Sequence, residues 1–391
     1  MNNIIAIVLD GVGIGELPDS EKYGDKGSNT LSNMAEVLNG IYLPNLENFG
    51  LGNITEIKGI KKVDNPKSFF GKMAEKSVGK DSTTGHWELG GIVTEKEFPL
   101  YPNGFPKEII NKFLELTGFK AVLGNKPASG TEIIKELGDE HVKTGNPIVY
   151  TSGDSVFQIA AHEEIIPLPR LYEICEIARH KVMTGKDAVG RIIARPFIGK
   201  SGEYKRTTNR KDFSIDPTSE TMLDVLQNAD INTVAIGKIN DLYNYRGINK
   251  KIKTISNLQG IENILVEAQL NTNSLIFANL VDFDVYYGHR NDPAGFYKAL
   301  KEFDDKLPMI VETIDESDLL LITADHGNDP TDISTDHTRE YVPILIYKKG
   351  VEGISLGVRE TFADFAQTIM HFFRINNSLA GKSMLIDLNR G

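Results

Sequence analysis

Cysteine is almost absent from this chain of 391 residues, which contains only Cys175. A lone thiol excludes an intramolecular disulfide, so the fold needs no oxidising compartment, and we interpret Cys175 as buried and structural. Long apolar runs are also missing. None approaches the roughly 18 residues of a membrane-spanning helix, and no basic stretch precedes the first apolar run. We therefore expect a cytoplasmic protein with no membrane partner.

Positive charge is in deficit, since 43 lysines and arginines face 54 aspartates and glutamates and leave a net charge of −11. This balance argues against nucleic acid as a partner, although a small anionic substrate fits a locally positive pocket. The composition is otherwise globular, with 40% apolar and 25% charged residues. At about 150 residues per domain, the length predicts two or three domains.

Short β-branched runs alternate with amphipathic stretches, which is typical of an α/β protein with a mostly parallel sheet flanked by helices. The expected strands are Ile4–Leu9, Thr233–Ile236, Ser274–Val281, Leu319–Thr323 and Val342–Tyr347, and the expected helices include Pro293–Ile314 and Thr361–Phe373. These elements lie towards the two ends of the chain. We therefore predict one core domain built from both ends.

The middle of the chain is richer in proline, glycine and charge, and it begins and ends in polar, turn-forming stretches. Its expected helices and strands are Lys107–Leu116, Glu132–Leu137, Ile148–Thr151 and Arg191–Pro196. The simplest interpretation is a smaller α+β cap domain, residues 98–214, inserted into a core of residues 1–97 and 215–391. We expect a monomer with a hinged cap.

Asp10 directly follows the first predicted strand and precedes the glycine-rich turn Gly11–Gly15. The carboxyl ends of parallel strands line the crevice where open α/β sheets bind ligands. A turn or capping role is the other interpretation of this residue. The spacing G-x-G-x-G differs from the dinucleotide fingerprint, and a carboxylate before it would repel a pyrophosphate.

Two Asp-His pairs, Asp325-His326 and Asp336-His337, frame one loop after the predicted strand Leu319–Thr323. A single pair of this kind is usually a cap or a surface feature, but two pairs around one loop indicate a site. Adjacent carboxylate and imidazole ligands suit a borderline cation such as Mn²⁺ or Zn²⁺.

A further predicted strand leads into Asp282 and Asp284, with His289 just beyond. The two-residue period of a strand places both aspartates on one face, so the spacing leaves the choice between them open. Three predicted parallel strands then end in aspartates, with histidines beyond two of them. A site for two divalent cations explains these residues together.

Three consecutive hydroxyls, Ser82, Thr83 and Thr84, precede Gly85 and the only tryptophan of the chain. Serine and threonine favour helix N-caps, which is one interpretation of this motif. A hydroxyl at a helix N-terminus that touches a metal can also ionise and attack phosphorus. The helix dipole and the cation both stabilise the negative charge that this attack requires.

Several stretches of the chain match one family. They are Asp10–Gly15, Gly79–Glu88, Thr323–Asp329, Thr335–Glu340, Asn125–Thr131, Tyr150–Ser155, Ile159–Glu164, Gly190–Pro196 and Val281–Asp284. Together they resemble the prokaryotic phosphopentomutases of the alkaline phosphatase superfamily, over essentially the whole chain. The Asp-His pair is general to the superfamily, whereas the Gly-His-Trp-Glu stretch and the segments of the insert are specific to the mutase.

The resemblance implies an enzyme that interconverts α-ribose 1-phosphate and ribose 5-phosphate, and the 2-deoxyribose pair. It implies two Mn²⁺ ions and a sugar bisphosphate activator such as glucose 1,6-bisphosphate. One ion would be held by Asp10, Asp325 and His326, and the other by Asp284, His289 and His337. The family's nucleophile falls on Ser82, where the usual residue is threonine, so Thr83 is the rival.

In the cycle that the resemblance implies, a phosphorylated Ser82 gives its phosphate to a free hydroxyl of the substrate, and the resulting bisphosphate returns its other phosphate. The inserted domain must exclude water and hold the distal phosphate. The candidate substrate-binding residues are Ser152, Asp154, Arg191, Arg206, Arg210 and Lys238. Those in the basic run Lys205–Lys211 have a solvated hinge surface as their alternative role.

Three other functions share parts of this pattern. A metal-dependent phosphatase or phosphodiesterase would use the same metals with water as the acceptor. A cofactor-independent phosphoglycerate mutase has a similar core with a different insert, and the matches inside the insert argue against both. A degenerate metal-binding scaffold would have lost a ligand, whereas all six proposed ligands are present.

Overall fold

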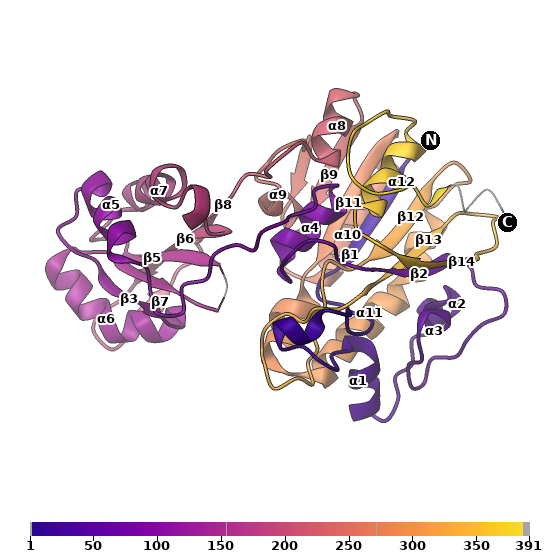
Figure 1. The fold of residues 1–391 in the computed structure, drawn as a ribbon, viewed down its shortest axis with the longest axis horizontal. Helices are drawn as coiled ribbons and strands as arrows, with labels where there is room; N and C mark the ends of the chain where they lie inside the picture. Colours follow the sequence, from indigo (N-terminus) through magenta and orange to yellow (C-terminus); the bar gives the residue numbers. More distant parts are fainter. Residues whose placement is uncertain (1, 154, 271, 386–391) are drawn as a thin grey trace. The chain divides into compact units, whose positions relative to one another are not determined.

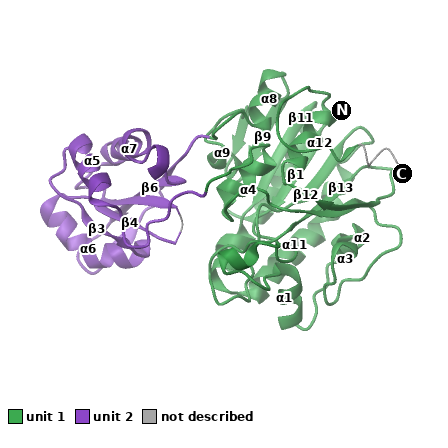
Figure 2. Cartoon of the chain, viewed as in Figure 1, with its two compact units in different colours: residues 1–96, 217–391 green, residues 97–216 purple. Residues whose placement is uncertain are grey.

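The computed structural model describes residues 2–153, 155–270 and 272–385, and the chain divides into two compact units (Figure 1 and Figure 2). Unit 1 comprises residues 1–96 and 217–391, and unit 2 comprises residues 97–216. The chain therefore leaves unit 1 once, forms unit 2 and returns. The predicted insert, residues 98–214, lies within unit 2.

Unit 1 is built on an eight-stranded sheet with the order β10-β9-β11-β1-β12-β13-β2-β14. Its strands are β1 (Ile4–Leu9), β2 (Phe69–Met73), β9 (Asn232–Ile236), β10 (Lys250–Ile252), β11 (Ser274–Leu280), β12 (Leu319–Thr323), β13 (Val342–Tyr347) and β14 (Ser355–Arg359). Most neighbouring pairs are parallel, but β13 is antiparallel to both β12 and β2. The mostly parallel sheet of an α/β protein is therefore confirmed.

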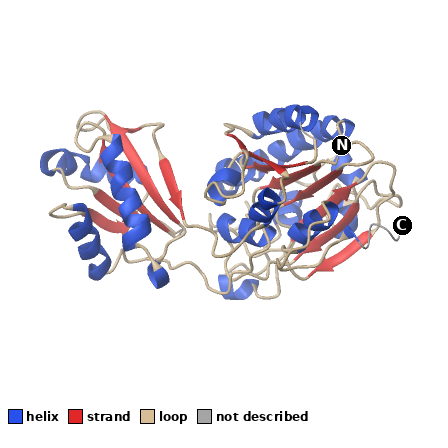
Figure 3. Ribbon diagram, turned by 90° about the horizontal axis from the view of Figure 1, so that it is seen from above, coloured by secondary structure: helices blue, strands red, loops and turns tan. Residues whose placement is uncertain are grey.

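Helices cover both faces of this sheet (Figure 3). They are α1 (Thr30–Val37), α2 (Pro44–Asn48), α3 (Leu51–Ile54), α4 (Ser82–Leu89), α8 (Met222–Asn228), α9 (Ile239–Leu242), α10 (Asn257–Leu270), α11 (Pro293–Glu312) and α12 (Asp364–Phe372). Every residue of β1, β11 and β12 is buried. Strands that are covered on both faces read as continuous apolar runs, which is why these three are visible in the sequence.

Unit 2 has its own sheet of six strands, in the order β3-β4-β5-β6-β7, with β8 also paired to β6. Its elements are α5 (Lys107–Thr117), β3 (Leu123–Pro127), α6 (Gly130–Thr144), β4 (Ile148–Thr151), β5 (Val156–His162), α7 (Leu168–Ile177), β6 (Arg191–Ile198), β7 (Lys205–Arg206) and β8 (Lys211–Ser214). The sheet mixes parallel and antiparallel pairs.

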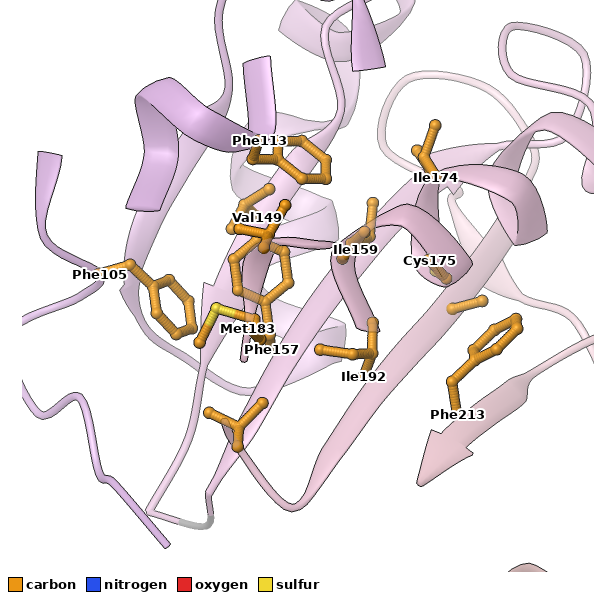
Figure 4. Packing of buried hydrophobic residues seen from close by; sticks show 14 of the residues in the cluster. Phe105, Phe113, Val149, Phe157, Ile159, Ile174, Cys175, Met183, Ile192 and Phe213 are labelled. Atoms are coloured by element: carbon orange, nitrogen blue, oxygen red, sulfur yellow. The ribbon is translucent and has the colours of Figure 1, made fainter. Parts of the chain in front are cut away.

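Apolar side chains pack on both faces of the unit 2 sheet. On one face, Phe113 of α5 and Ile174 of α7 pack with Val149, Phe157 and Cys175 (Figure 4). On the other face, α6 packs against alternate residues of the same strands. The Cys175 thiol is buried, and burial raises its pKa well above the ordinary value, so it is structural as predicted.

Candidate active site

Three adjacent strands of unit 1 carry acidic residues to one edge of the sheet. β1 lies between β11 and β12 and is parallel to both, with Leu9 opposite Leu280 and Val8 opposite Thr323. At this edge, Asp10 directly follows β1, and Asp325 follows β12 after one intervening residue, Ala324. The carboxyl ends of parallel strands thus meet where ligands bind in open α/β sheets.

The aspartates after β11 do not share a face, which corrects the expectation from strand periodicity. β11 ends at Leu280, and a π-helical turn, Phe283–Tyr287, follows. Asp282 accepts a hydrogen bond from the Asn257 amide nitrogen of α10 (2.7 Å), whereas Asp284 is buried among histidines. The turn replaces the two-residue period of a strand with a helical one and so separates the two carboxylates.

The first cluster consists of Asp10, Asp325 and His326, whose ligand atoms lie within 4.8 Å of one another. His326 Nε2 is 3.4 Å from Asp10 Oδ1 and 3.3 Å from Asp325 Oδ2. All three side chains are buried. These are the residues that the resemblance assigns to one ion.

The second cluster consists of Asp284, His326 and His337, so His326 belongs to both. His337 Nε2 is 3.4 Å from Asp284 Oδ1. His289 adjoins this cluster, with its Nε2 3.3 Å from Asp284 Oδ2, and its Nδ1 is 2.6 Å from the carbonyl oxygen of Thr335. Asp336, the other half of the second Asp-His pair, has its Oδ2 3.4 Å from Lys80 Nζ instead.

The donor set fits divalent cations. Asp10 Oδ1 and Asp325 Oδ2 are buried and accept no hydrogen bond from the described residues. Their nearest polar neighbours are imidazole nitrogens, of His326 for both and of His86 (3.0 Å) for Asp325. A bound cation satisfies such atoms. Carboxylates and imidazoles together suit first-row transition metals. Within the described residues, both candidate metal groups lie at this one edge of the sheet.

Nearby positive groups lower the pKa of two of the aspartates and so favour the carboxylate form that binds a cation. Burial opposes ionisation of Asp10, but Lys238 and His326 outweigh it, and its pKa is lowered to about 2. Burial opposes ionisation of Asp284 as well, yet His337 and His289 hold its pKa well below the ordinary value. Burial would lower the pKa of His326, but Asp325 and Asp10 raise it well above the usual value. A proton on His326 therefore competes with a metal.

Ser82 is the hydroxyl that faces the clusters. Its Oγ is 3.0 Å from His326 Nε2. The N-cap of α4 is Asp81 and not a hydroxyl, because the Asp81 carboxylate accepts from the Thr83 and Thr84 amide nitrogens and from Thr84 Oγ1. Any side chain at Gly85 would collide with the Asp325 backbone, so glycine lets α4 approach the site.

Sequence reasoning gave no role to Asn279, whose amide joins two parts of the site. Asn279 Nδ2 donates to Asp10 Oδ2 (3.0 Å) and lies 3.3 Å from His86 Nε2. His86 Nδ1 is 2.9 Å from the Ser82 carbonyl oxygen, so the partners place the imidazole proton on Nδ1. The available signal was a polar residue within the apolar run of a fully buried strand, β11, whose other polar residue is Ser274 at its start.

Arg339 and Glu340, at the end of the loop that carries His337, also escaped prediction. Arg339 is buried and donates to Glu75 and to the carbonyl oxygens of Glu75, Ser77 and Gly79, the segment that leads to Ser82. Glu340 accepts from the amide nitrogens of Gly15 and Thr30. These two side chains join the segments that carry the metal ligands and the nucleophile.

The six candidate substrate-binding residues divide between the units. Lys238 belongs to unit 1, and its Nζ is 3.6 Å from Asp10 Oδ2. The other five belong to unit 2, where Asp154 lies outside the described residues. Arg191 and Arg210 both approach Asp212, at 3.7 Å and 2.6 Å. Arg206 is exposed on β7, and Ser152 follows β4.

Comparison with known proteins defines the class. The chain matches a family model described as the metalloenzyme superfamily over residues 2–377. The structure of phosphoglycerate mutase from Leishmania mexicana aligns over 97% of each chain, with a TM-score of 0.50 and 11% identity. The structure of a protein from Pyrococcus horikoshii aligns over 97% of this chain and 99% of its own, with a TM-score of 0.50 and 12% identity. At such identities these structures show the fold alone. The protein is a metalloenzyme with an alkaline-phosphatase-like fold, and its metals are divalent cations.

Its closer relatives define the family. A phosphopentomutase from Dictyoglomus thermophilum is 56% identical over 100% of both chains. One from Acetivibrio thermocellus is 56% identical over 98% of this chain and 99% of its own, and one from Clostridium acetobutylicum is 51% identical over 98% of each. The chain belongs to the phosphopentomutase family, which confirms the resemblance seen in its sequence. It is therefore an isomerase of the intramolecular phosphotransferase type.

A membrane anchor was not expected from the sequence. Among the residues that the structure describes, no helix combines the length and the apolar character needed to cross a bilayer.

Proposed function

We propose that this enzyme interconverts α-ribose 1-phosphate and ribose 5-phosphate, and the 2-deoxyribose pair, through phosphorylated Ser82 and a sugar bisphosphate. The observation that carries the proposal is the position of Ser82 Oγ, 3.0 Å from the imidazole shared by both candidate metal groups. Full-length relatives named phosphopentomutase support the substrate class.

We propose that two Mn²⁺ ions bind here, one with Asp10, Asp325 and His326 as ligands and the other with Asp284, His289 and His337. When bound, they supply positive charge to the transferring phosphoryl group and to the serine oxygen. The first three ligands coincide with one of the two groups seen in the structure. For the second ion, the shared His326 is a further candidate beside His289.

The protein's own groups position the transfer. Helix α4 presents Ser82 at its first turn, where backbone N–H groups and the helix dipole favour negative charge. In the step, the bond between phosphorus and Ser82 Oγ breaks and a bond from phosphorus to the substrate hydroxyl oxygen forms. The proton that this hydroxyl loses is balanced by the proton that Ser82 Oγ gains, so the step regenerates the free serine hydroxyl. The reverse transfer from the other end of the bisphosphate restores phosphorylated Ser82.

We propose that residues 98–214 form the cap domain of this enzyme and supply Ser152, Asp154, Arg191, Arg206 and Arg210 to the sugar phosphate, while the core supplies Lys238. The compactness of unit 2 and its separate apolar core support its treatment as a domain. A guanidinium group can donate two parallel hydrogen bonds to a phosphate group. The hydroxyl of serine and the carboxylate of aspartate can accept hydrogen bonds from the hydroxyls of a sugar.

The test is an isomerisation assay. Purified enzyme with Mn²⁺ and a catalytic amount of glucose 1,6-bisphosphate should convert ribose 5-phosphate into ribose 1-phosphate without releasing inorganic phosphate. The matched control is Ser82→Ala, which should form no product. Stoichiometric inorganic phosphate without ribose 1-phosphate would show a phosphatase instead.

A further inference from the structure

His86 lies between the turn that carries Ser82 and two of the candidate metal ligands. Its side chain is buried, one helical turn after Ser82 on α4. The Nδ1 atom of its imidazole is 2.9 Å from the Ser82 carbonyl oxygen and 3.0 Å from Asp325 Oδ2. The Nε2 atom is 3.3 Å from Asn279 Nδ2, and this amide donates to Asp10 Oδ2 at 3.0 Å. The imidazole therefore adjoins Asp325 directly and Asp10 through one amide.

The donors and acceptors in this chain of contacts follow from Asp10. A carboxylate only accepts, so the Asn279 amide turns its NH₂ group towards Asp10. The same NH₂ group also faces His86, so Nε2 accepts and the imidazole proton is on Nδ1. This proton serves the Ser82 carbonyl oxygen, and its partial positive charge lies beside Asp325 Oδ2. A neutral imidazole in one tautomer therefore matches the polar atoms on both of its sides.

The orientation of the Asn279 amide depends on His86. Asn279 Oδ1 is buried and accepts no hydrogen bond from the described residues. The amide is therefore oriented through Nδ2 alone, by Asp10 on one side and by His86 on the other. A side chain without an acceptor in place of the imidazole leaves one amide hydrogen without a partner. Because a buried donor without a partner is unfavourable, this change favours rotation of the amide away from Asp10.

Contacts with neighbouring elements hold the imidazole in place. The Trp87 indole nitrogen donates to a carbonyl oxygen at the end of α9 at 3.0 Å, and the Tyr243 hydroxyl donates to the His86 carbonyl oxygen. The centroid of the His86 ring is 6.3 Å from that of Phe277 on β11. The same strand carries Asn279. The imidazole is thus fixed against the strand whose amide it orients.

His86 is not placed to act as a base for the nucleophile. Its contact with Ser82 is to the carbonyl oxygen, whereas the Ser82 hydroxyl contacts a different imidazole. We propose that His86 is a positioning residue for the metal ligands. It holds Asp325 directly and Asp10 through Asn279, in the orientation that a cation requires. The inference rests on the proposed metal ligands, and removal of such an outer partner typically lowers metal affinity roughly 10–100-fold.

The experiment measures the Mn²⁺ affinity of the full-length protein by competition with a chelator, in His86→Leu and His86→Asn. Leucine has neither the donor nor the acceptor, so we expect it to lower the affinity roughly tenfold or more. The amide nitrogen of asparagine lies as many bonds from Cα as Nδ1 does and donates to the same acceptors, so His86→Asn should lose clearly less. When His86→Leu is combined with Asn279→Ala, the loss should be smaller than the product of the two single losses, because both changes break one chain of contacts.

The matched control is His141→Leu, which makes the same change at a buried histidine of unit 2. Both ring nitrogens of His141 also have hydrogen-bond partners, the Asn146 carbonyl oxygen and the His162 amide nitrogen. This variant should leave the Mn²⁺ affinity unchanged. If His86→Leu fails to fold, His86→Gln replaces it under the same criteria, since glutamine carries its amide one bond further from Cα than Nδ1.

Three results would each overturn the proposal: equal losses in His86→Leu and His86→Asn, independent losses in the double variant, or a loss in His86→Leu no greater than in His141→Leu. Absence of Mn²⁺ binding by the unmodified protein would overturn it together with the proposed metal ligands. The measurement involves no turnover, so release of inorganic phosphate in the isomerisation assay would contradict the proposed function and leave this inference standing.

Discussion

At the scale of single residues, the three hydroxyls of the motif have different environments. Ser82 Oγ lies 3.0 Å from His326 Nε2, whereas Thr84 Oγ1 donates to the Asp81 carboxylate at 2.6 Å. Thr83 follows the first helical residue of α4 and is buried. Nucleophilic attack requires a hydroxyl that reaches the metal ligands, and Ser82 has that position.

We expect Ser82→Ala to abolish the phosphoenzyme and Thr83→Ala to retain it, because the Ser82 hydroxyl, and not that of Thr83, is in hydrogen-bond contact with His326 among the described residues. Enzyme incubated with glucose 1,6-bisphosphate and Mn²⁺ would be analysed by intact mass and by peptide mapping of the phosphorylated residue. A phosphoenzyme in Ser82→Ala that is missing in Thr83→Ala would place the nucleophile one residue later.

A second prediction concerns Asn279, which orients Asp10 through a 3.0 Å hydrogen bond. Removing the outer partner of a metal ligand typically lowers metal affinity roughly 10–100-fold, and we expect this of Asn279→Ala. Competition with a metal chelator measures the affinity directly. The matched control is Asn3→Ala, which removes the two buried hydrogen bonds that Asn3 Oδ1 accepts from Ser274 at the opposite end of β1. Equal losses in both variants would indicate a general loss of stability.

At the scale of elements, the site depends on how loops are held at the ends of strands. Glu340 accepts from the backbone nitrogens of Gly15 and Thr30, and its other oxygen accepts from Thr30 Oγ1 and Thr338 Oγ1. One buried carboxylate therefore connects the loop after β1, the start of α1 and the loop after β12. Burial raises the pKa of Glu340 from 4.5 to about 7.

This raised pKa predicts a pH-dependent stability. The folded state holds the proton of Glu340 more tightly than the unfolded state, so the contribution is fully present below about pH 4.5 and is lost as pH rises through about 7. The difference in unfolding free energy between wild type and Glu340→Gln should fall by about 3 kcal/mol from acidic to neutral pH. Urea unfolding in EDTA measures it, and a difference that is independent of pH would contradict the assignment.

At the scale of the whole molecule, two units with separate apolar cores carry different parts of the chemistry. Unit 1 holds the candidate metal ligands and Ser82, and unit 2 holds most of the candidate cations for the substrate. Asp10, Asp284 and Asp325 are buried anions that a bound cation stabilises in the folded state only. Metal binding should therefore raise the free energy of unfolding of unit 1.

We expect Mn²⁺ at 100 times its Kd to stabilise unit 1 by about 2.7 kcal/mol relative to the EDTA-treated protein. Hydrogen exchange followed by mass spectrometry locates the effect. Peptides that contain the ends of β1, β11 and β12 should lose protection on metal removal, while peptides within residues 97–216 should not. Equal loss of protection in both units would show that they unfold as one.

Much of unit 1 could be predicted because the decisive signals are local. β1 and β12 have the predicted bounds, and β11 ends one residue early. Their residues are apolar in continuous runs since helices cover both faces of the sheet, and such runs are visible without any knowledge of contacts. Asp10, Asp325 and His326 lie together because parallel strands end at one edge of a sheet, which alternation of strands and helices already predicts.

Other features depend on contacts between residues far apart in the chain. The antiparallel direction of β13, the separation of Asp282 from Asp284 and the position of Asp81 as the cap of α4 follow from loop paths and packing. The hydrogen bonds from Asn279 to Asp10 and from Arg339 to the segment before Ser82 span more than 250 residues. Spacing within a sequence carries no information about such pairs.

The sequence by itself determined the fold class, the family and the residue types of the site, because periodicity and motifs are properties of neighbouring residues. Only the tertiary structure decided which hydroxyl faces His326, that His326 belongs to both candidate metal groups, and that Arg206 lies with Arg195 and Lys205 around one cavity. These outcomes depend on the directions of side chains across packed elements, which are set by the whole chain at once.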